Sequence, residues 1–136
     1  MAALIDWDSS LSLDLPEIDA QHLALVQLIN DLHAAMIGGK SQEVLGETLD
    51  RLIAYAESHF STEEAYFTQS GFLQAVAHKT AHREFVDKVQ EFKQDFAAKK
   101  VMLSMEIMAF LKDWLVQHIM GTDRKYVDAF KAAGIG

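Results

Sequence analysis

Hydrophobic residues recur along this chain at alternating spacings of three and four, the period of amphipathic α-helices. The pattern is interrupted at Pro16, Gly38-Gly39 and Ser70-Gly71, residue types that start or end helices, and again at Lys99-Lys100. The stretches that carry it run over residues 18–36, 45–66, 75–96 and 103–118. Four helices joined by short loops predict an all-α fold, an antiparallel up-and-down four-helix bundle.

The two ends of the chain differ from this pattern. Residues 1–16 form a non-periodic N-terminal arm, and the bundle occupies residues 17–120. After Gly121, residues 121–136 form a tail with a short C-terminal helix that carries Tyr126, Val127 and Phe130. A chain of 136 residues suits one hydrophobic core, so we expect a single domain over residues 1–136.

Five of the six histidines, and one glutamate, occupy positions of the helical pattern where Leu or Phe would be expected. A single core histidine is commonly a hydrogen-bonded structural residue, but five would each carry a desolvation cost. In an antiparallel bundle the start of the first helix, the end of the second, the start of the third and the end of the fourth lie together. These residues sit at those ends: His22, His59, Glu63, His78, His82 and His118.

The local spacings agree with a shared site. His59 and Glu63 are four residues apart, as are His78 and His82, so each pair lies on one helix face about 6 Å long. Asp123 follows His118 by five residues, which on an ideal α-helix places the two side chains about 140° apart. Asp123 can therefore face inward only if the helix loosens, and Gly121 offers a place for that.

His33 serves as a comparison. It lies eleven residues after His22 on roughly the same face, but about 16 Å further along the helix axis. It cannot reach the same metal ion, and we interpret it as an ordinary partly buried or surface histidine.

Imidazole and carboxylate without thiolate suit iron, manganese or zinc. The chain has no cysteine, which excludes disulfides, iron–sulfur clusters and c-type haem attachment. Seven ligands are too many for one ion, so the set implies two ions bridged by carboxylates. Neither the Glu-x-x-His pairs of ferritin-like di-iron enzymes nor the His-Glu-x-x-His signature of zinc proteases occurs.

Charge and composition exclude other classes. The net charge is −8 and the twelve basic residues are scattered, so we expect no nucleic-acid surface. The most apolar stretch, residues 101–120, contains Glu106, Lys112 and Asp113, which indicates an amphipathic helix and no membrane insertion. No secretory signal is visible, and the absence of cysteine agrees with a cytoplasmic location.

The motifs, in this order and at these separations, resemble those of the hemerythrin family over nearly the whole chain, from Trp7 to Tyr126. They are Ile18-Asp-Ala-Gln-His22, His59-Phe-Ser-Thr-Glu63-Glu64, His78-Lys-Thr-Ala-His82 and Trp114-Leu-Val-Gln-His118-Ile-Met-Gly-Thr-Asp123. The resemblance implies two iron ions joined by an oxo or hydroxo bridge. By it, His78, His82 and His118 would hold one iron, His22 and His59 the other, and Glu63 and Asp123 would bridge both.

The same resemblance implies a function. If both irons are octahedral, these ligands and the bridging oxygen leave one position open, on the iron held by only two histidines. An open position invites a small ligand, a logic stated for zinc that transfers here. The residues that resemble the family's O2 pocket are Leu25, Phe60, Trp114, Leu115 and Ile119. The implied function is reversible O2 binding without catalysis, because this lining offers few proton donors.

Other functions remain open at this point. A di-iron peroxidase or oxidase, a nitric-oxide-binding protein with NO or small anions at the open position, and a structural or metal-storage bundle are alternatives. Bacterial hemerythrin-like domains occur as free carriers for oxygen transport or storage, and as C-terminal oxygen-sensing domains of chemotaxis receptors. The Met1-Ala2-Ala3 start and the loose ending at residues 132–136 favour a domain excised from a larger sensory protein. Sensing predicts that the arm around Trp7 moves on oxidation or ligand binding.

Overall fold

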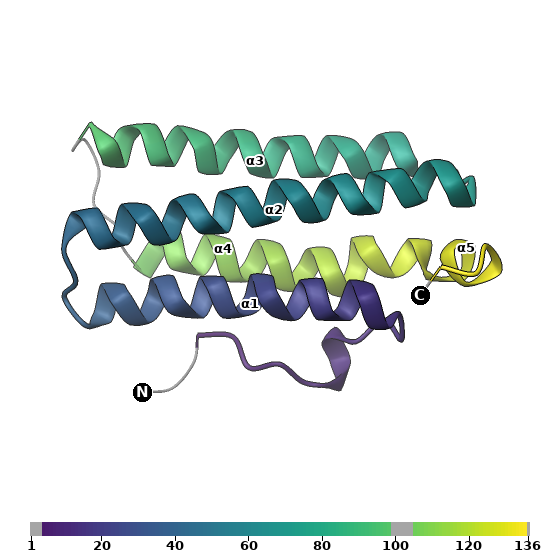
Figure 1. Ribbon diagram of the computed structural model, residues 1–136, viewed down its shortest axis with the longest axis horizontal. Coiled ribbons are helices and arrows are strands. Elements are labelled where there is room, and N and C mark those ends of the chain that lie inside the picture. The colour runs from purple at the N-terminus through teal and green to yellow at the C-terminus, as the bar shows by residue number, and fades with distance from the viewer. Residues whose placement is uncertain (1–3, 99–104, 136) are drawn as a thin grey trace.

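The computed structural model describes residues 4–98 and 105–135, and its long elements are helices that run antiparallel side by side (Figure 1). Their order confirms the predicted all-α bundle. The helices are α1 (Pro16–Ile37), α2 (Gln42–Ser70), α3 (Ala75–Ala97), α4 (Met105–Gln117) and the short α5 (Val127–Ala132).

The helix ends follow from local sequence. Pro16 occupies the first turn of α1, where a missing N–H costs nothing. The Ser41 hydroxyl accepts the Val44 N–H at 3.3 Å and caps α2, which ends at Gly71 with a φ of 68°, the left-handed region that favours glycine. The predicted start of the fourth helix, from Lys99-Lys100 to Leu103, lies outside the described residues.

The core lies along the bundle axis and uses the predicted faces, although some positions of the pattern, such as Met36, Leu45 and Phe92, are only half-buried. Tyr66, the last residue of the predicted 45–66 pattern, is also half-buried, and its hydroxyl donates to the carboxylate of Glu17 at 2.8 Å. The next residue, Phe67, is buried in its place. Aromatic rings at both positions carry the same hydrophobic signal, but only the phenol has a polar atom that water or a carboxylate can satisfy.

The N-terminal arm is more ordered than its lack of period suggests. It runs beside α1, contains a short 3₁₀ turn (Ser9–Leu11), and buries Leu11, Leu13 and Leu15 against the core (Figure 1). The Asn30 side chain exchanges two hydrogen bonds of 2.9 Å with the backbone of Ile5. The arm is therefore packed onto the bundle.

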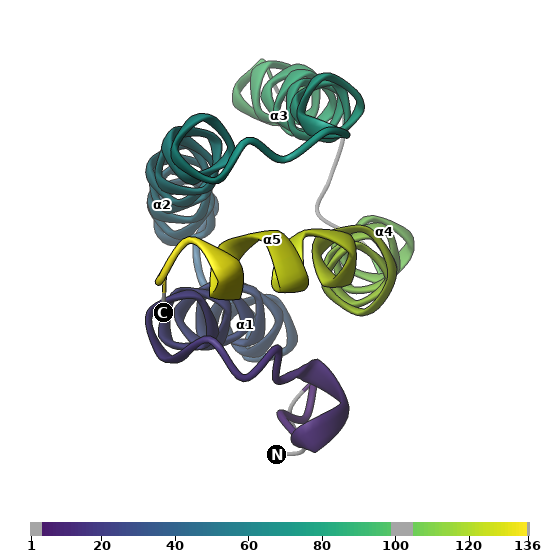
Figure 2. The same ribbon diagram turned by 90° about the vertical axis from the view of Figure 1, so that its right-hand side faces the viewer.

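The C-terminal segment crosses one end of the bundle (Figure 2). Tyr126 and Phe130 of this segment are fully buried, their rings stacked 4.0 Å apart. The arm meets this segment through Arg124, which donates to the Ser10 carbonyl at 2.8 Å, and through the Lys131–Asp14 ion pair at 3.0 Å. The C-terminal segment closes this end of the bundle, and these two contacts hold the arm against it.

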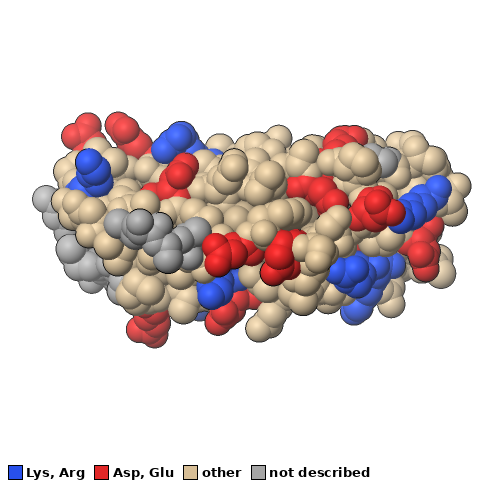
Figure 3. Space-filling view, turned by 90° about the horizontal axis from the view of Figure 1, so that it is seen from below, with Lys and Arg blue, Asp and Glu red and all other residues tan. Residues whose placement is uncertain are grey.

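On the face drawn in Figure 3, basic side chains alternate with acidic ones and form no concentrated basic patch. Within residues 4–98 and 105–135, no helix is both long enough and apolar enough to cross a bilayer.

Candidate metal centre

The seven predicted ligand side chains converge at the end of the bundle closed by α5. Three long helices contribute directly, with His22 from α1, His59 and Glu63 from α2, and His78 and His82 from α3, while His118 and Asp123 come from the turns that follow α4. All seven are at most 5% exposed. The topology argument made from sequence, which placed these helix ends together, holds in three dimensions.

The end of α4 shows how Asp123 turns inward. The helix changes at His118 into a π turn (His118–Thr122), and the Asp123 N–H donates to the His118 carbonyl five residues back. A π turn holds more residues than an α turn, so it brings residues five apart onto one face. The Nε2 of His118 and the Oδ1 of Asp123 lie 3.0 Å apart.

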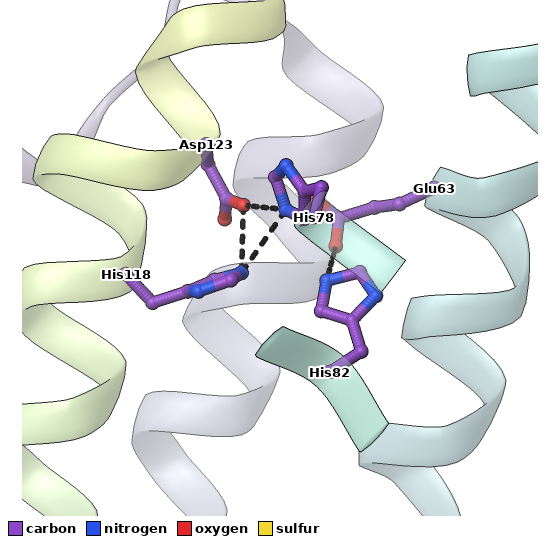
Figure 4. A group of neighbouring side chains, drawn as sticks. All are labelled: Glu63, His78, His82, His118 and Asp123. Atoms are coloured by element: carbon purple, nitrogen blue, oxygen red, sulfur yellow. Dashed lines mark hydrogen bonds and ion pairs between the residues drawn. The ribbon is translucent and has the colours of Figure 1, made fainter. Parts of the chain in front are cut away.

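Five side chains form the larger group (Figure 4). The Oδ1 of Asp123 lies 2.8 Å from the Nε2 of His78, and the Nε2 atoms of His78 and His118 lie 3.1 Å apart. The Nε2 of His82 lies 3.2 Å from the Oε1 of Glu63. The donor atoms thus face a common space.

The smaller group consists of His22, His59 and Glu63. The Oε1 of Glu63 lies 3.2 Å from the Nε2 of His59, the same distance as from His82 in the larger group. The Oδ2 of Asp123 lies 3.0 Å from the Nε2 of His22, while its Oδ1 faces His78 and His118. Both carboxylates therefore stand between the two groups, where bridging ligands would stand.

The donor atoms fit metal ions better than each other. Buried atoms without a hydrogen-bond partner include the Nε2 of His22 and of His82, the Oε1 of Glu63 and both carboxylate oxygens of Asp123. Each such atom costs about 1–3 kcal/mol if nothing satisfies it. Metal–ligand bonds of about 2.1 Å at right angles put neighbouring ligand atoms about 3 Å apart, which matches the separations here.

Buried charged groups lie close together in this cluster, and they shift one another's pKa values. Burial opposes ionisation of Glu63, but the imidazoles, His59 first, hold the pKa of its carboxyl well below the usual range. Burial likewise opposes the charge on His22, yet contacts with Asp123 and Glu63 raise its pKa to about 9. His22 therefore tends to hold a proton at neutral pH, and a metal bound to it must displace that proton.

Comparison with known proteins shows to which family this chain belongs. The sequence profile of the Hemerythrin HHE cation binding domain matches residues 13–130, which include all seven clustered side chains. The chain belongs to the hemerythrin family.

The relatives agree along almost the whole chain. A bacteriohemerythrin of Stenotrophomonas maltophilia is 34% identical over 130 residues, which cover 96% of this chain and 84% of that protein. A hemerythrin-like protein of Naegleria gruberi is 37% identical over 121 residues, 89% of each chain. The crystal structure of a wild-type hemerythrin matches with a TM-score of 0.88 at 29% identity, over 93% of this chain and 98% of that one.

Three further side chains contact members of the cluster and were not predicted as site residues. The Oε1 of Gln21 lies 2.6 Å from the Nδ1 of His59, and the Oε2 of Glu64 lies 3.0 Å from the Nδ1 of His82. The fully buried Tyr126 hydroxyl donates to the Oε2 of Glu63. Burial, first, and the charges of Asp123 and Glu63 raise the pKa of Tyr126, so the hydroxyl keeps its proton.

The residues predicted to line an O2 pocket lie in or beside the core. The Phe60 ring stacks on His82 at 3.9 Å, and the half-buried Trp114 stacks on His118 at 4.3 Å. The aliphatic members, Leu25, Leu115 and Ile119, are buried in the hydrophobic core. His33 is half-buried and belongs to neither ligand group.

Proposed function

We propose that this hemerythrin-family protein binds O2 reversibly at a non-haem di-iron centre. The observation that carries the proposal is the unequal division of the seven buried ligands into two groups that share Glu63 and are linked by Asp123. His78, His82 and His118 would hold one iron, and His22 and His59 the other. The second iron would then keep a position open for a small ligand.

The iron pair, when bound, supplies the electrons that reversible O2 binding requires. The protein would hold the two irons in place and exclude water from them. Glu63 and Asp123 fix the separation of the two positions, and Tyr126 orients Glu63 through its hydroxyl. The rings of Phe60 and Trp114 cover the imidazoles of His82 and His118 and keep water from them.

This lining supports binding over catalysis. An oxidase or peroxidase needs an acid that delivers protons to its substrate. The predicted pocket consists of Leu25, Phe60, Trp114, Leu115 and Ile119, none of which carries a titratable group. The nearby Tyr126 hydroxyl already donates to Glu63. NO or a small anion would use the same open position as O2.

One contact favours sensing over simple carriage. Arg124 directly follows Asp123 and donates to the Ser10 carbonyl of the N-terminal arm at 2.8 Å. The Nε of Arg124 also donates to the Met120 carbonyl of the π turn at 3.2 Å. A shift of Asp123 that accompanies ligand binding can therefore reach the arm, where a sensory partner could read it.

Reconstitution with ferrous iron under nitrogen, followed by O2, tests the proposal. We expect a visible charge-transfer band that appears with O2 and disappears when O2 is removed. His118→Ala should abolish this band, and the matched variant His33→Ala should keep it. An iron-loaded protein without the band would overturn O2 binding, and sustained turnover with an electron donor, faster than autoxidation, would favour an enzyme.

A further inference from the structure

Two of the ligand imidazoles have a side-chain acceptor behind them, and the two acceptors differ in charge. The Nε2 atoms of His59 and His82 both face the Oε1 of Glu63 at 3.2 Å. Their Nδ1 atoms face outward to oxygens that can only accept a hydrogen bond, so each Nδ1 carries a proton and donates. His59 donates to the amide oxygen of Gln21 at 2.6 Å, and His82 to the carboxylate of Glu64 at 3.0 Å. Each prospective metal position thus has one such imidazole.

The two acceptors come from neighbouring helices. Gln21 of α1 reaches His59 on α2, and Glu64 of α2 reaches His82 on α3. The pairing is not general, because the Nδ1 atoms of His22 and His78 have no partner within the described part of the chain. The two positions therefore differ both in the number of histidines and in the charge behind one of them.

A carboxylate draws the imidazole proton more strongly than an amide does, which makes the opposite ring nitrogen a stronger donor to a metal. A stronger donor stabilises the more highly charged ion. We propose that Glu64 is a positioning residue that makes the metal held by His78, His82 and His118 the easier of the two to oxidise, because the other metal has only the amide of Gln21 behind its histidine. This inference rests on the proposed di-iron function.

The surroundings of Glu64 limit the size of the effect. Its side chain is 34% exposed and lines a groove of about 270 Å³ between α2 and α3, together with Phe60, Lys79, His82 and Arg83. Solvent in this groove screens the carboxylate, so the charge acts chiefly through its hydrogen bond to His82. We therefore expect a change of about one order of magnitude in relative affinity, at the lower end of the 10- to 100-fold range for such partners.

The test changes the charge of each acceptor, from a carboxylate to an amide at Glu64 and from an amide to a carboxylate at Gln21. In the iron-loaded protein, Glu64→Gln should shift the preference for ferric over ferrous iron down by about tenfold, a rise of about 59 mV in midpoint potential for one electron. Gln21→Glu should lower the midpoint potential, because it places a carboxylate behind His59. Glu57→Gln is the matched control, since it removes a carboxylate from the same groove and should leave the potential unchanged.

Spectroelectrochemical titration measures the potential, with electrons exchanged between the iron and a chemical mediator. The electron paramagnetic resonance spectrum of the one-electron-oxidised form reports which iron is ferric, and it should change in Glu64→Gln but not in Glu57→Gln. A merely structural role for Glu64 would not produce shifts of opposite sign in Glu64→Gln and Gln21→Glu. If Glu64→Gln does not fold, Gln21→Glu still tests the inference. A lowered midpoint potential would support it, and an unchanged or raised one would overturn it.

The outcomes separate this inference from the proposed function. A wild-type protein that takes up no iron would overturn the di-iron proposal itself. A wild-type protein that shows the reversible band, with equal potentials in the Glu64→Gln and Glu57→Gln variants, would overturn the role of Glu64 alone. Cobalt(II) binding to the metal-free protein gives a redox-independent check, because Glu64→Gln should weaken it by about tenfold or more.

Discussion

Asp123 reaches His118 across a π turn, with its Oδ1 at 3.0 Å from the Nε2 of His118 and its N–H bonded to the His118 carbonyl. On a regular α-helix the two side chains would diverge by about 140°. The turn therefore brings a carboxylate into the cluster that α-helical geometry would turn away. Its cost is a weakened helix end, which Arg124 partly offsets by donating to the Met120 carbonyl.

The π turn does not depend on its glycine. A Cβ at Gly121 would meet no atom within 4 Å, and the residue has no positive φ. We expect Gly121→Ala to bind cobalt(II) as the wild type does and to unfold at the same or a slightly higher temperature. Gly71→Ala is the contrasting variant, because its φ of 68° should cost about 1–2 kcal/mol. Loss of metal binding in Gly121→Ala alone would contradict this view.

Tyr126 is expected to matter through its hydroxyl more than through its ring. Tyr126→Phe keeps the ring that stacks on Phe130 but leaves the buried Oε2 of Glu63 without its donor. The metal-free protein should lose about 1–3 kcal/mol in its free energy of unfolding, measured by urea denaturation. Tyr66→Phe is the matched control, since its hydroxyl donates to the exposed Glu17 and should cost less than 1 kcal/mol, roughly the value of a solvent-exposed bond. Equal losses would contradict the assigned role.

Much of this architecture follows from the sequence, for identifiable reasons. The period of the hydrophobic residues predicts the helix faces, and antiparallel topology then brings His22, His59, His78 and His118 to one end. Gln21 directly precedes His22 and Glu64 directly follows Glu63 in the quoted motifs, but they hydrogen-bond to histidines of other helices. Which neighbour a side chain reaches depends on the rotation of packed helices, which hydrophobic spacing does not specify. Tyr126 was recognised only as part of an apolar face, because its pattern does not reveal where its hydroxyl points.

The metal-free protein should become less stable as the pH rises above neutrality. Burial opposes the charge of His22, but Asp123 and Glu63 raise its pKa to about 9, from 6.5. A raised pKa contributes stability that is fully present below pH 6.5 and is lost as the pH rises through about 9. Urea denaturation at a series of pH values should show this decline, and His22→Gln should remove it. An unchanged slope in His22→Gln would assign the decline to another group.

The apolar lining should slow loss of the oxygenated form. Ile119→Thr places a hydroxyl in the predicted pocket and shortens the side chain, which admits water and a proton donor to a dry site. We expect the visible band to decay severalfold faster in air than in the wild type. Ile29→Thr makes the same substitution at a buried position about 10 Å along α1 from His22 and controls for lost stability. Equal decay in both variants would contradict the role of Ile119.

The contact between Arg124 and the arm predicts a readable response to ligand. Trp7 is half-buried and packs against the core, and the arm meets the ligand-bearing segment through the bond from Arg124 to the Ser10 carbonyl. If Asp123 shifts when the centre is oxidised, amide hydrogen exchange around Trp7 and Ser10 should differ between the ferrous and oxidised forms. Arg124→Ala should remove this difference while leaving the visible band intact, and Lys125→Ala, one residue further along, should not. Equal protection of the arm in both oxidation states of the wild type would count against sensing and leave carriage as the role of O2 binding.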